Sequence, residues 1–150
     1  VMDTREDRMR FAVEQLGADE TIFADAEAEK TAERLTAGEW YDVVIDATGN
    51  AIPMQRGFNF LAHGARYVLL SVVRQDITFS DPEFHKREAT LIASRNAQPD
   101  DFAEVVRQIE AGLVPTAALN THRAPLNQAA DLFATWSQPE AGVIKAILEI

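Results

Sequence analysis

Asp3 and Arg8 are the first residues whose chemistry suggests a ligand. Asp3 follows the apolar residues Val1 and Met2, as if at the end of a strand. A carboxylate there can accept hydrogen bonds from both ribose hydroxyls of an adenosine, and it repels a 2′-phosphate. Arg8 stands in the first turn of the predicted helix, within reach of the same ribose. An acid before a helix is also a common helix cap, so Asp3 by itself has two interpretations.

Further candidates follow predicted strands, where ligands bind in open parallel sheets. Thr48 and Gly49 come after the strand predicted at 41–46. Glycine lets a backbone approach a flat ligand closely, although the same pair also suits an ordinary strand-to-helix turn. The residues that follow the strands predicted at 67–70 and 90–93, or end them, are Ser71, Val72, Ala93 and Arg95. Arg95 suits a phosphate or a surface carboxylate.

Lys145 lies inside the apolar strand predicted over 143–150. A lysine in such a strand must extend its ammonium group to solvent or pair with an anion. It is therefore a candidate contact for an anionic ligand.

The residues that metal binding, hydrolase catalysis and a glycine-rich dinucleotide turn require are absent from the sequence. His85 and Glu88 have a possible helical metal spacing, but zinc requires more ligands and the chain has no cysteine. The G-x-S-x-G turn of hydrolases and the G-x-G-x-x-G turn of dinucleotide-binding domains are both absent. We expect no metal site and no catalytic residue within this chain.

The composition and net charge of the chain limit the classes of partner that it can bind. The chain has 150 residues, 47% hydrophobic and 25% charged, and a net charge of −10. So acidic a chain repels nucleic acid and anionic lipid, and no apolar run approaches the roughly 18 residues of a membrane span. We expect a soluble, cytoplasmic protein with neither nucleic acid nor membrane as a partner.

Strand and helix signals alternate along the chain, which predicts a doubly wound, mostly parallel α/β sheet. Thr4 and Asp7 resemble a capping box for a first helix that Gly17 ends, and a later helix starts near Pro53 and ends at Gly64. The segment 74–88 interrupts the alternation, as an edge strand or an excursion would. The predicted strands are 21–23, 41–46, 67–70, 90–93 and 143–150, and the remaining predicted helices are 25–35, 99–113 and 127–136.

In this order, the segments resemble zinc-type medium-chain alcohol and polyol dehydrogenases, in particular the sorbitol, L-idonate and L-galactonate dehydrogenase branch. The segments that carry the resemblance are 3–8, 16–19, 41–50, 64–71, 84–88, 92–97, 122–126 and 139–149. The resemblance implies a Rossmann-like fold and NAD as the cofactor. It implies that Asp3 holds the adenosine ribose with Arg8 beside it, and that Asp3 favours NAD over NADP.

The resemblance also implies places for the other candidates. Thr48 and Gly49 would contact the adenosine half of NAD, and Lys145 would lie against its pyrophosphate. The residues implied at the nicotinamide end, largely through their backbone groups, are Ser71, Val72, Ala93 and Arg95.

The chain departs from the family in what it lacks. Family members have an N-terminal catalytic domain with the zinc ligands, and a first strand and glycine-rich turn in the nucleotide domain. We expect residues 1–150 to form an incomplete, truncated Rossmann domain whose C-terminal segment returns toward the absent catalytic domain. The longer parent would be a zinc-dependent oxidoreductase that transfers hydride from a secondary alcohol, polyol or sugar acid to NAD. This chain alone would be inactive.

The missing first strand has a structural consequence. Without it, unpaired backbone groups would flank an open slot in the sheet. We therefore expect residues 1 to 40 to leave their family position. They would pair directly with the strand at 41–46, swap onto a second chain, or pack as loose helices. The strands at 41–46, 67–70 and 90–93 would remain a parallel core.

Two alternatives remain open at this point. One is another Rossmann-like enzyme, such as an S-adenosylmethionine methyltransferase. Those enzymes end on an antiparallel hairpin, whereas here helices precede a lone final strand. The other is a non-catalytic fragment competent only for self-association. In the dehydrogenase interpretation we also expect a homo-oligomer through 77–88, with Ile77, Phe79 and Phe84 buried against a second subunit.

Overall fold

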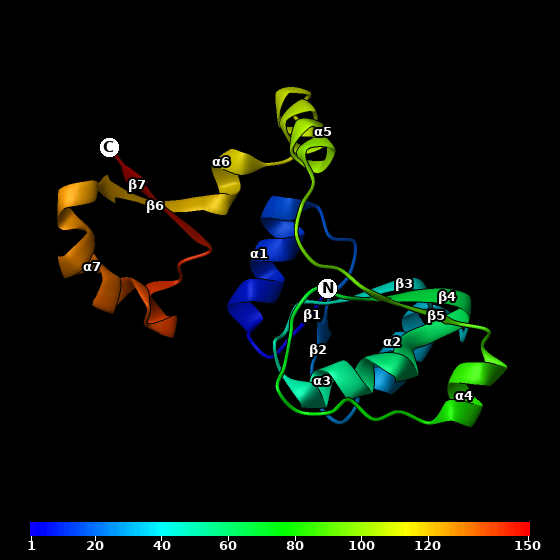
Figure 1. Cartoon of the computed structure of the whole chain (residues 1–150). Coiled ribbons are helices and arrows are strands. Elements are labelled where there is room, and N and C mark those ends of the chain that lie inside the picture. Colours follow the sequence, from blue (N-terminus) through cyan, green and yellow to red (C-terminus); the bar gives the residue numbers. More distant parts are fainter. The chain divides into compact units, whose positions relative to one another are not determined.

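The computed structural model describes residues 1–150, which divide into two compact units. The terminal unit combines Val1–Phe23 with Ala97–Ile150, and the central unit is Ala24–Asn96. In Figure 1 the central unit runs from light blue to green, and the terminal unit comprises the dark blue start and the yellow to red end of the chain.

The central unit is built on a three-stranded parallel sheet. Its strands are β3 (Tyr41–Asp46), β4 (Leu61–Leu69) and β5 (Thr90–Ala93), paired in the order β3-β4-β5. The predicted parallel core of these strands is confirmed. The helices of this unit are α2 (Ala28–Leu35), α3 (Ala51–Arg56), a 3-10 turn (Gly57–Phe60) and α4 (Asp81–Lys86).

Tyr67 lies at the centre of the core of this unit. Its side chain has no exposed surface, and its hydroxyl donates a hydrogen bond to the carbonyl of Met54 at 2.7 Å. Phe58 packs edge-on against its ring, with the centroids 4.8 Å apart. The buried residues clustered around them are Leu61, Ala62 and Ala65. This cluster fixes α3 and the 3-10 turn against the sheet.

One prediction for the central unit is wrong. The helix from Pro53 does not continue to Gly64, because the chain tightens into the 3-10 turn after Arg56 and Leu61 already begins β4. Of the two alternatives for 74–88, an edge strand or an excursion, the structure has the excursion, because 77–79 forms no strand. Phe79 instead stacks on Phe58 at 4.4 Å, and α4 follows. Ring packing within the chain thus replaces strand pairing in this excursion.

The terminal unit contains two separate pairs of strands. β1 (Met2–Asp3) pairs in parallel with β2 (Ile22–Phe23), and α1 (Glu6–Leu16) connects them. β6 (Asn120–Pro125) pairs in parallel with β7 (Lys145–Glu149). The remaining elements are α5 (Pro99–Glu110), α6 (Thr116–Leu119), α7 (Ala129–Trp136) and two 3-10 turns (Leu126–Gln128 and Pro139–Ala141).

The strand pairing excludes one of the three alternatives for residues 1–40 and corrects one further prediction. β1 and β2 form a sheet of their own, so the first 40 residues do not pair directly with the strand at 41–46. The final strand is not alone either, because β6 pairs with it along its length. The parallel direction of that pair also differs from the antiparallel hairpin expected of a methyltransferase.

The start of α1 differs from the predicted capping box. Arg5 occupies the N-cap, and no side chain caps the helix from that position. Asp7 is engaged by the Arg5 guanidinium at 2.6 Å, so it does not bond back to Thr4. Gly17 ends the helix as predicted, with a φ of 71° that few other residues adopt.

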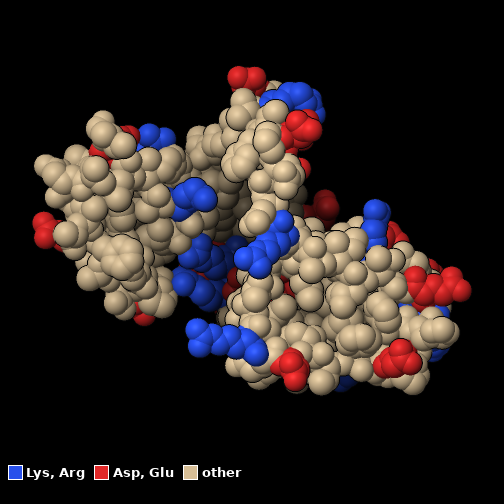
Figure 2. Space-filling model, viewed as in Figure 1, with Lys and Arg blue, Asp and Glu red and all other residues tan.

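The apolar stripe of α5 is uncovered. Phe102 is 64% exposed and Val105 53% exposed. Figure 2 shows the helix as a largely tan surface with charged side chains near its end. No helix of the chain combines the length and apolar character that crossing a membrane requires.

Candidate functional site

The turn after β3 is organised by a buried carboxylate. Asp46, the last residue of β3, is only 6% exposed. Its Oδ1 accepts hydrogen bonds from the backbone N–H of Thr48 at 3.0 Å and from the Thr48 hydroxyl at 3.1 Å. The turn is therefore held against the strand that precedes it.

Ser71 links this turn to the one after β4. Its hydroxyl donates to Asp46 Oδ1 at 3.1 Å and accepts the backbone N–H of Gly49 at 2.9 Å. Three of the predicted site residues, Thr48, Gly49 and Ser71, are thus brought together at the carboxyl ends of neighbouring parallel strands. Ligands of open α/β sheets bind at this edge.

Asp46 itself was not among the predicted site residues. The signal was an acid directly after the apolar run Val43-Val44-Ile45, because such a group must be buried with donors or turned to solvent. Its actual donor set includes Ser71, which is 25 residues away.

Gly49 leaves open space beside the turn. Its φ is +64°, in the left-handed region that favours glycine, and a Cβ atom there would have no neighbour within 4 Å. Directly after it, the Asn50 side chain accepts the N–H of Ile52 at 3.0 Å and caps α3. The backbone of this turn is therefore ordered by side chains on one side and accessible on the other.

Val72, Ala93 and Arg95 surround the same strand ends. Val72 is 83% exposed, and Ala93 ends β5 opposite Leu69 of β4. Arg95 is exposed and forms no ion pair. These residues follow the strands as predicted, and their contact with a cofactor stays a prediction.

Asp3, Arg8 and Lys145 belong to the terminal unit. Asp3 Oδ1 accepts the backbone N–H of Arg5 at 2.9 Å, which leaves its second oxygen without a partner in the chain. The Arg8 guanidinium donates to the carbonyl of Val143, two residues before Lys145. Lys145 begins β7 and is exposed. The Arg8 contact ties α1 to the segment that carries Lys145.

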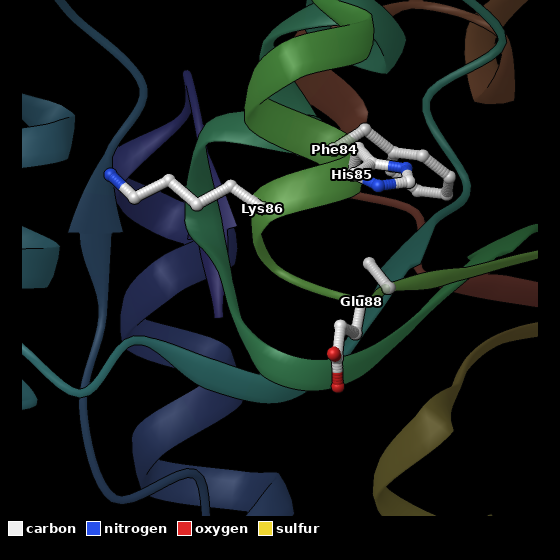
Figure 3. A pocket seen from close by; sticks show the side chains of 5 residues that line it. Phe84, His85, Lys86 and Glu88 are labelled. Atoms are coloured by element: carbon white, nitrogen blue, oxygen red, sulfur yellow. The ribbon is translucent and has the colours of Figure 1, made fainter.

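A shallow pocket of about 450 Å³ lies elsewhere, around the end of α4. Its lining residues are Phe84, His85, Lys86, Glu88 and Ala89, none of which was predicted as a site residue. In Figure 3 the Glu88 carboxylate points away from the His85 ring. In the chain, no group of three or more His, Asp or Glu residues is placed to hold a metal ion. The residues of this chain therefore do not fit a zinc site.

Comparison with known proteins identifies the family. Residues 1–111 match the sequence model of the family described as zinc-binding dehydrogenase. The chain belongs to the zinc-binding dehydrogenases. The predicted resemblance to zinc-type medium-chain dehydrogenases is therefore confirmed.

Two curated proteins are similar to this chain in sequence. L-galactonate-5-dehydrogenase of Escherichia coli K12 is 42% identical over 90 residues, which is 60% of this chain and 26% of that protein. Erythritol/L-threitol dehydrogenase of Mycolicibacterium smegmatis is 30% identical over 128 residues, 85% of this chain and 35% of that protein. The chain spans about a quarter to a third of the length of these relatives.

Solved structures share the fold of this zinc-binding dehydrogenase chain. An alcohol dehydrogenase from Thermotoga maritima is 25% identical with a TM-score of 0.81, and the match covers 99% of this chain and 42% of that one. A short chain alcohol dehydrogenase from E. coli CFT073, complexed with NADH, has a TM-score of 0.87 at 21% identity, covering 100% and 44%. The α/β, Rossmann-like fold class is as predicted.

Proposed function

We propose that this chain is the NAD-binding part of a longer, zinc-dependent dehydrogenase that takes hydride from a secondary alcohol of a polyol or sugar acid. Membership of the zinc-binding dehydrogenases supports the reaction class. The named activities of the two curated relatives, on L-galactonate and on erythritol or L-threitol, support the substrate class. The structural neighbour complexed with NADH supports the cofactor.

One observation in the chain carries the NAD assignment. Asp46 and Ser71 hold the turns after β3 and β4 together, while the space beside Gly49 stays open at the ligand-binding edge of a parallel sheet. Thr48 and Gly49 would contact the adenosine half of the cofactor. The residues assigned to the nicotinamide end are Ser71, Val72, Ala93 and Arg95.

The terminal unit would supply the remaining contacts. Asp3 has a free carboxylate oxygen that would bind the adenosine ribose, Arg8 would flank this ribose, and the exposed Lys145 would meet the pyrophosphate. Bound NAD supplies the hydride acceptor. The zinc ligands and the catalytic residues would lie in other parts of the longer protein, so this chain alone would not catalyse the reaction.

The longer protein would act in the cytoplasm on a small-molecule alcohol. It would form a homo-oligomer through residues 77–88. Within it, residues 1–150 would be the incomplete nucleotide domain, whose C-terminal segment returns toward the catalytic domain.

The test is a titration of this chain with NADH, followed by nucleotide fluorescence or calorimetry. Saturable binding is expected, and Gly49→Ala should weaken it because the methyl group enters the open space beside the turn. Gly38→Ala is the matched control. Gly38 also has a positive φ with open space around it, but it lies outside the site. An absence of NADH binding, or equal loss in both variants, contradicts the assignment.

A further inference from the structure

We propose that Asp46 is a positioning residue that couples the turn after β3 to the turn after β4, so that both present their backbones to the cofactor in one arrangement. This inference rests on the proposed NAD-binding function. Asp46 would not touch the cofactor itself. It would act through Ser71 and Gly49.

The environment of Asp46 is the first argument. Asp46 is only 6% exposed, yet none of the ion pairs of the chain includes it. A buried carboxylate without a counter-ion is costly unless hydrogen bonds replace its water shell. Here the donors are the backbone N–H and hydroxyl of Thr48 and the hydroxyl of Ser71. The charge is thus stabilised by two turns that must both stay in place.

The direction of the hydrogen bonds is the second argument. The Ser71 hydroxyl has a single proton, and at 3.1 Å it is donated to Asp46 Oδ1. That bond orients the hydroxyl so that a lone pair accepts the N–H of Gly49 at 2.9 Å. Gly49 has no hydrogen bond to Asp46, yet the acceptor for its amide depends on the carboxylate. The backbone beside the open space is therefore held by a relay that begins at Asp46.

Amide hydrogen exchange tests the relay without any cofactor. Asp46→Ala should speed exchange at Thr48, which loses its acceptor directly, and also at Gly49. The expected increase at Gly49 is about tenfold, which is the order of one hydrogen bond. Asp42→Ala is the matched control, because Asp42 lies on the same strand but is exposed. Unchanged exchange at Gly49 in Asp46→Ala would overturn the proposal.

Two further variants distinguish loss of the relay from misfolding of the chain. Ser71→Ala should speed exchange at Gly49 but not at Thr48, whose acceptor remains. If Asp46→Ala does not fold, amide exchange is measured in Asp46→Asn instead, because the oxygen of the new side-chain amide can still accept a hydrogen bond from Ser71. Gly49 exchange should then lie between the wild-type and the Ser71→Ala values. A value equal to wild type, with Thr48 exchange also unchanged, would show that the charge on Asp46 has no positioning role.

Cofactor affinity completes the test. If NADH binds to the wild-type chain, Asp46→Ala and Ser71→Ala should each weaken it, by about tenfold for the former. The double variant should be no weaker than Asp46→Ala, since both changes break one relay. Additive losses would overturn the relay. If the wild type does not bind NADH while Gly49 exchange still depends on Asp46, the NAD assignment fails and the coupling of the two turns stands.

Discussion

The backbone of Gly57 lies directly against the ring of Tyr67. A Cβ atom at position 57 would stand 2.1 Å from the Tyr67 hydroxyl oxygen and 2.5 Å from the ring carbon that carries it. Tyr67 has no room to move, because it is fully buried and its hydroxyl is bonded to Met54. The passage from α3 into the 3-10 turn is thus shaped by a side chain of the following strand.

Gly57→Ala should destabilise the chain by about 1–3 kcal/mol, because the added methyl group overpacks a core that cannot yield. Gly57 has an ordinary helical φ of −54°, so backbone strain does not contribute. Thermal unfolding should show a lower midpoint. A second substitution, Tyr67→Leu, should remove most of the added penalty. Equal midpoints for Gly57→Ala and wild type would contradict this contact.

Tyr67 should make stability fall at alkaline pH. Burial, and secondarily the nearby Asp46 carboxylate, raise the pKa of Tyr67 well above its usual value of about 10. Above pH 10 the unfolded chain therefore holds fewer protons at this tyrosine than the folded chain, so the free energy of unfolding decreases as pH rises. Urea unfolding between pH 8 and 11 should show a steeper loss for wild type than for Tyr67→Phe. Parallel pH profiles would refute the assignment.

Asp3 should determine the choice between NAD and NADP. Its free oxygen would meet a 2′-phosphate at close range, so Asp3→Ser should improve NADPH binding relative to NADH by about tenfold. The ratio of the two dissociation constants measures this. Asp19→Ser, an exposed acid beyond the end of α1, is the control and should leave the ratio unchanged. NADPH binding as tight as NADH binding with Asp3 intact would show that the ribose lies elsewhere.

Glu29 and Arg56 should stabilise the central unit in a pH-dependent way. The Arg56 guanidinium hydrogen-bonds Glu29, with Nε to Oε1 at 2.6 Å, and holds the pKa of that carboxyl below its usual range. The stabilisation is present above the ordinary pKa of about 4.3 and is lost as pH falls below it. Arg56→Gln should cost about 0.5–1 kcal/mol at neutral pH, measured by urea unfolding.

The exposed pair Lys30 and Glu27 offers a control for that measurement. Its side chains are 75% and 62% exposed, so Lys30→Gln should change stability little. If Arg56→Gln behaves like Lys30→Gln at every pH, the bond between α2 and α3 contributes nothing measurable.

Phe79 should be the decisive residue of the proposed oligomer interface. Ile77, Phe79 and Phe84 all pack against the core of their own chain, but Phe79, which stacks on the core residue Phe58, remains 42% exposed. Phe79→Ser should therefore shift sedimentation toward the monomer. Phe133→Ser, which changes a 73% exposed ring on α7, should not. A wild-type chain that sediments as a monomer at all concentrations would rule this interface out for the chain alone.

The sequence correctly predicted those helices and strands whose formation depends on residues close together in the chain. The β-branched run at 41–46 forms β3, and Gly17 ends α1 as its backbone freedom suggests. β6 was missed because Asn120–Pro125 has no apolar alternation, and its strand conformation depends on pairing with β7 more than 20 residues later. A short window of sequence does not contain that information.

The residues of the candidate site also divide into those that the local sequence predicted and those that depend on contacts distant in sequence. Thr48, Gly49 and Ser71 could be found because they follow predicted strands. Asp46 could not be assigned a role, because its burial depends on a hydroxyl from the next strand's turn. The end of α3 was misplaced for a similar reason, since Tyr67 lies ten residues beyond Gly57.

The terminal unit joins residues from both ends of the chain, and this determines when it can form during synthesis. Its bond between Arg8 and Val143 spans 135 residues, whereas the central unit is one continuous segment. On the ribosome, residues 24–96 are complete while the partner of Arg8 has yet to be translated. The central unit can therefore fold during translation, and the first 23 residues must wait for the last. Until Val143 is translated, α1 lacks this bond and keeps its contacts with β1 and β2, so residues 1–23, the first segment of the terminal unit, are the last to become fixed.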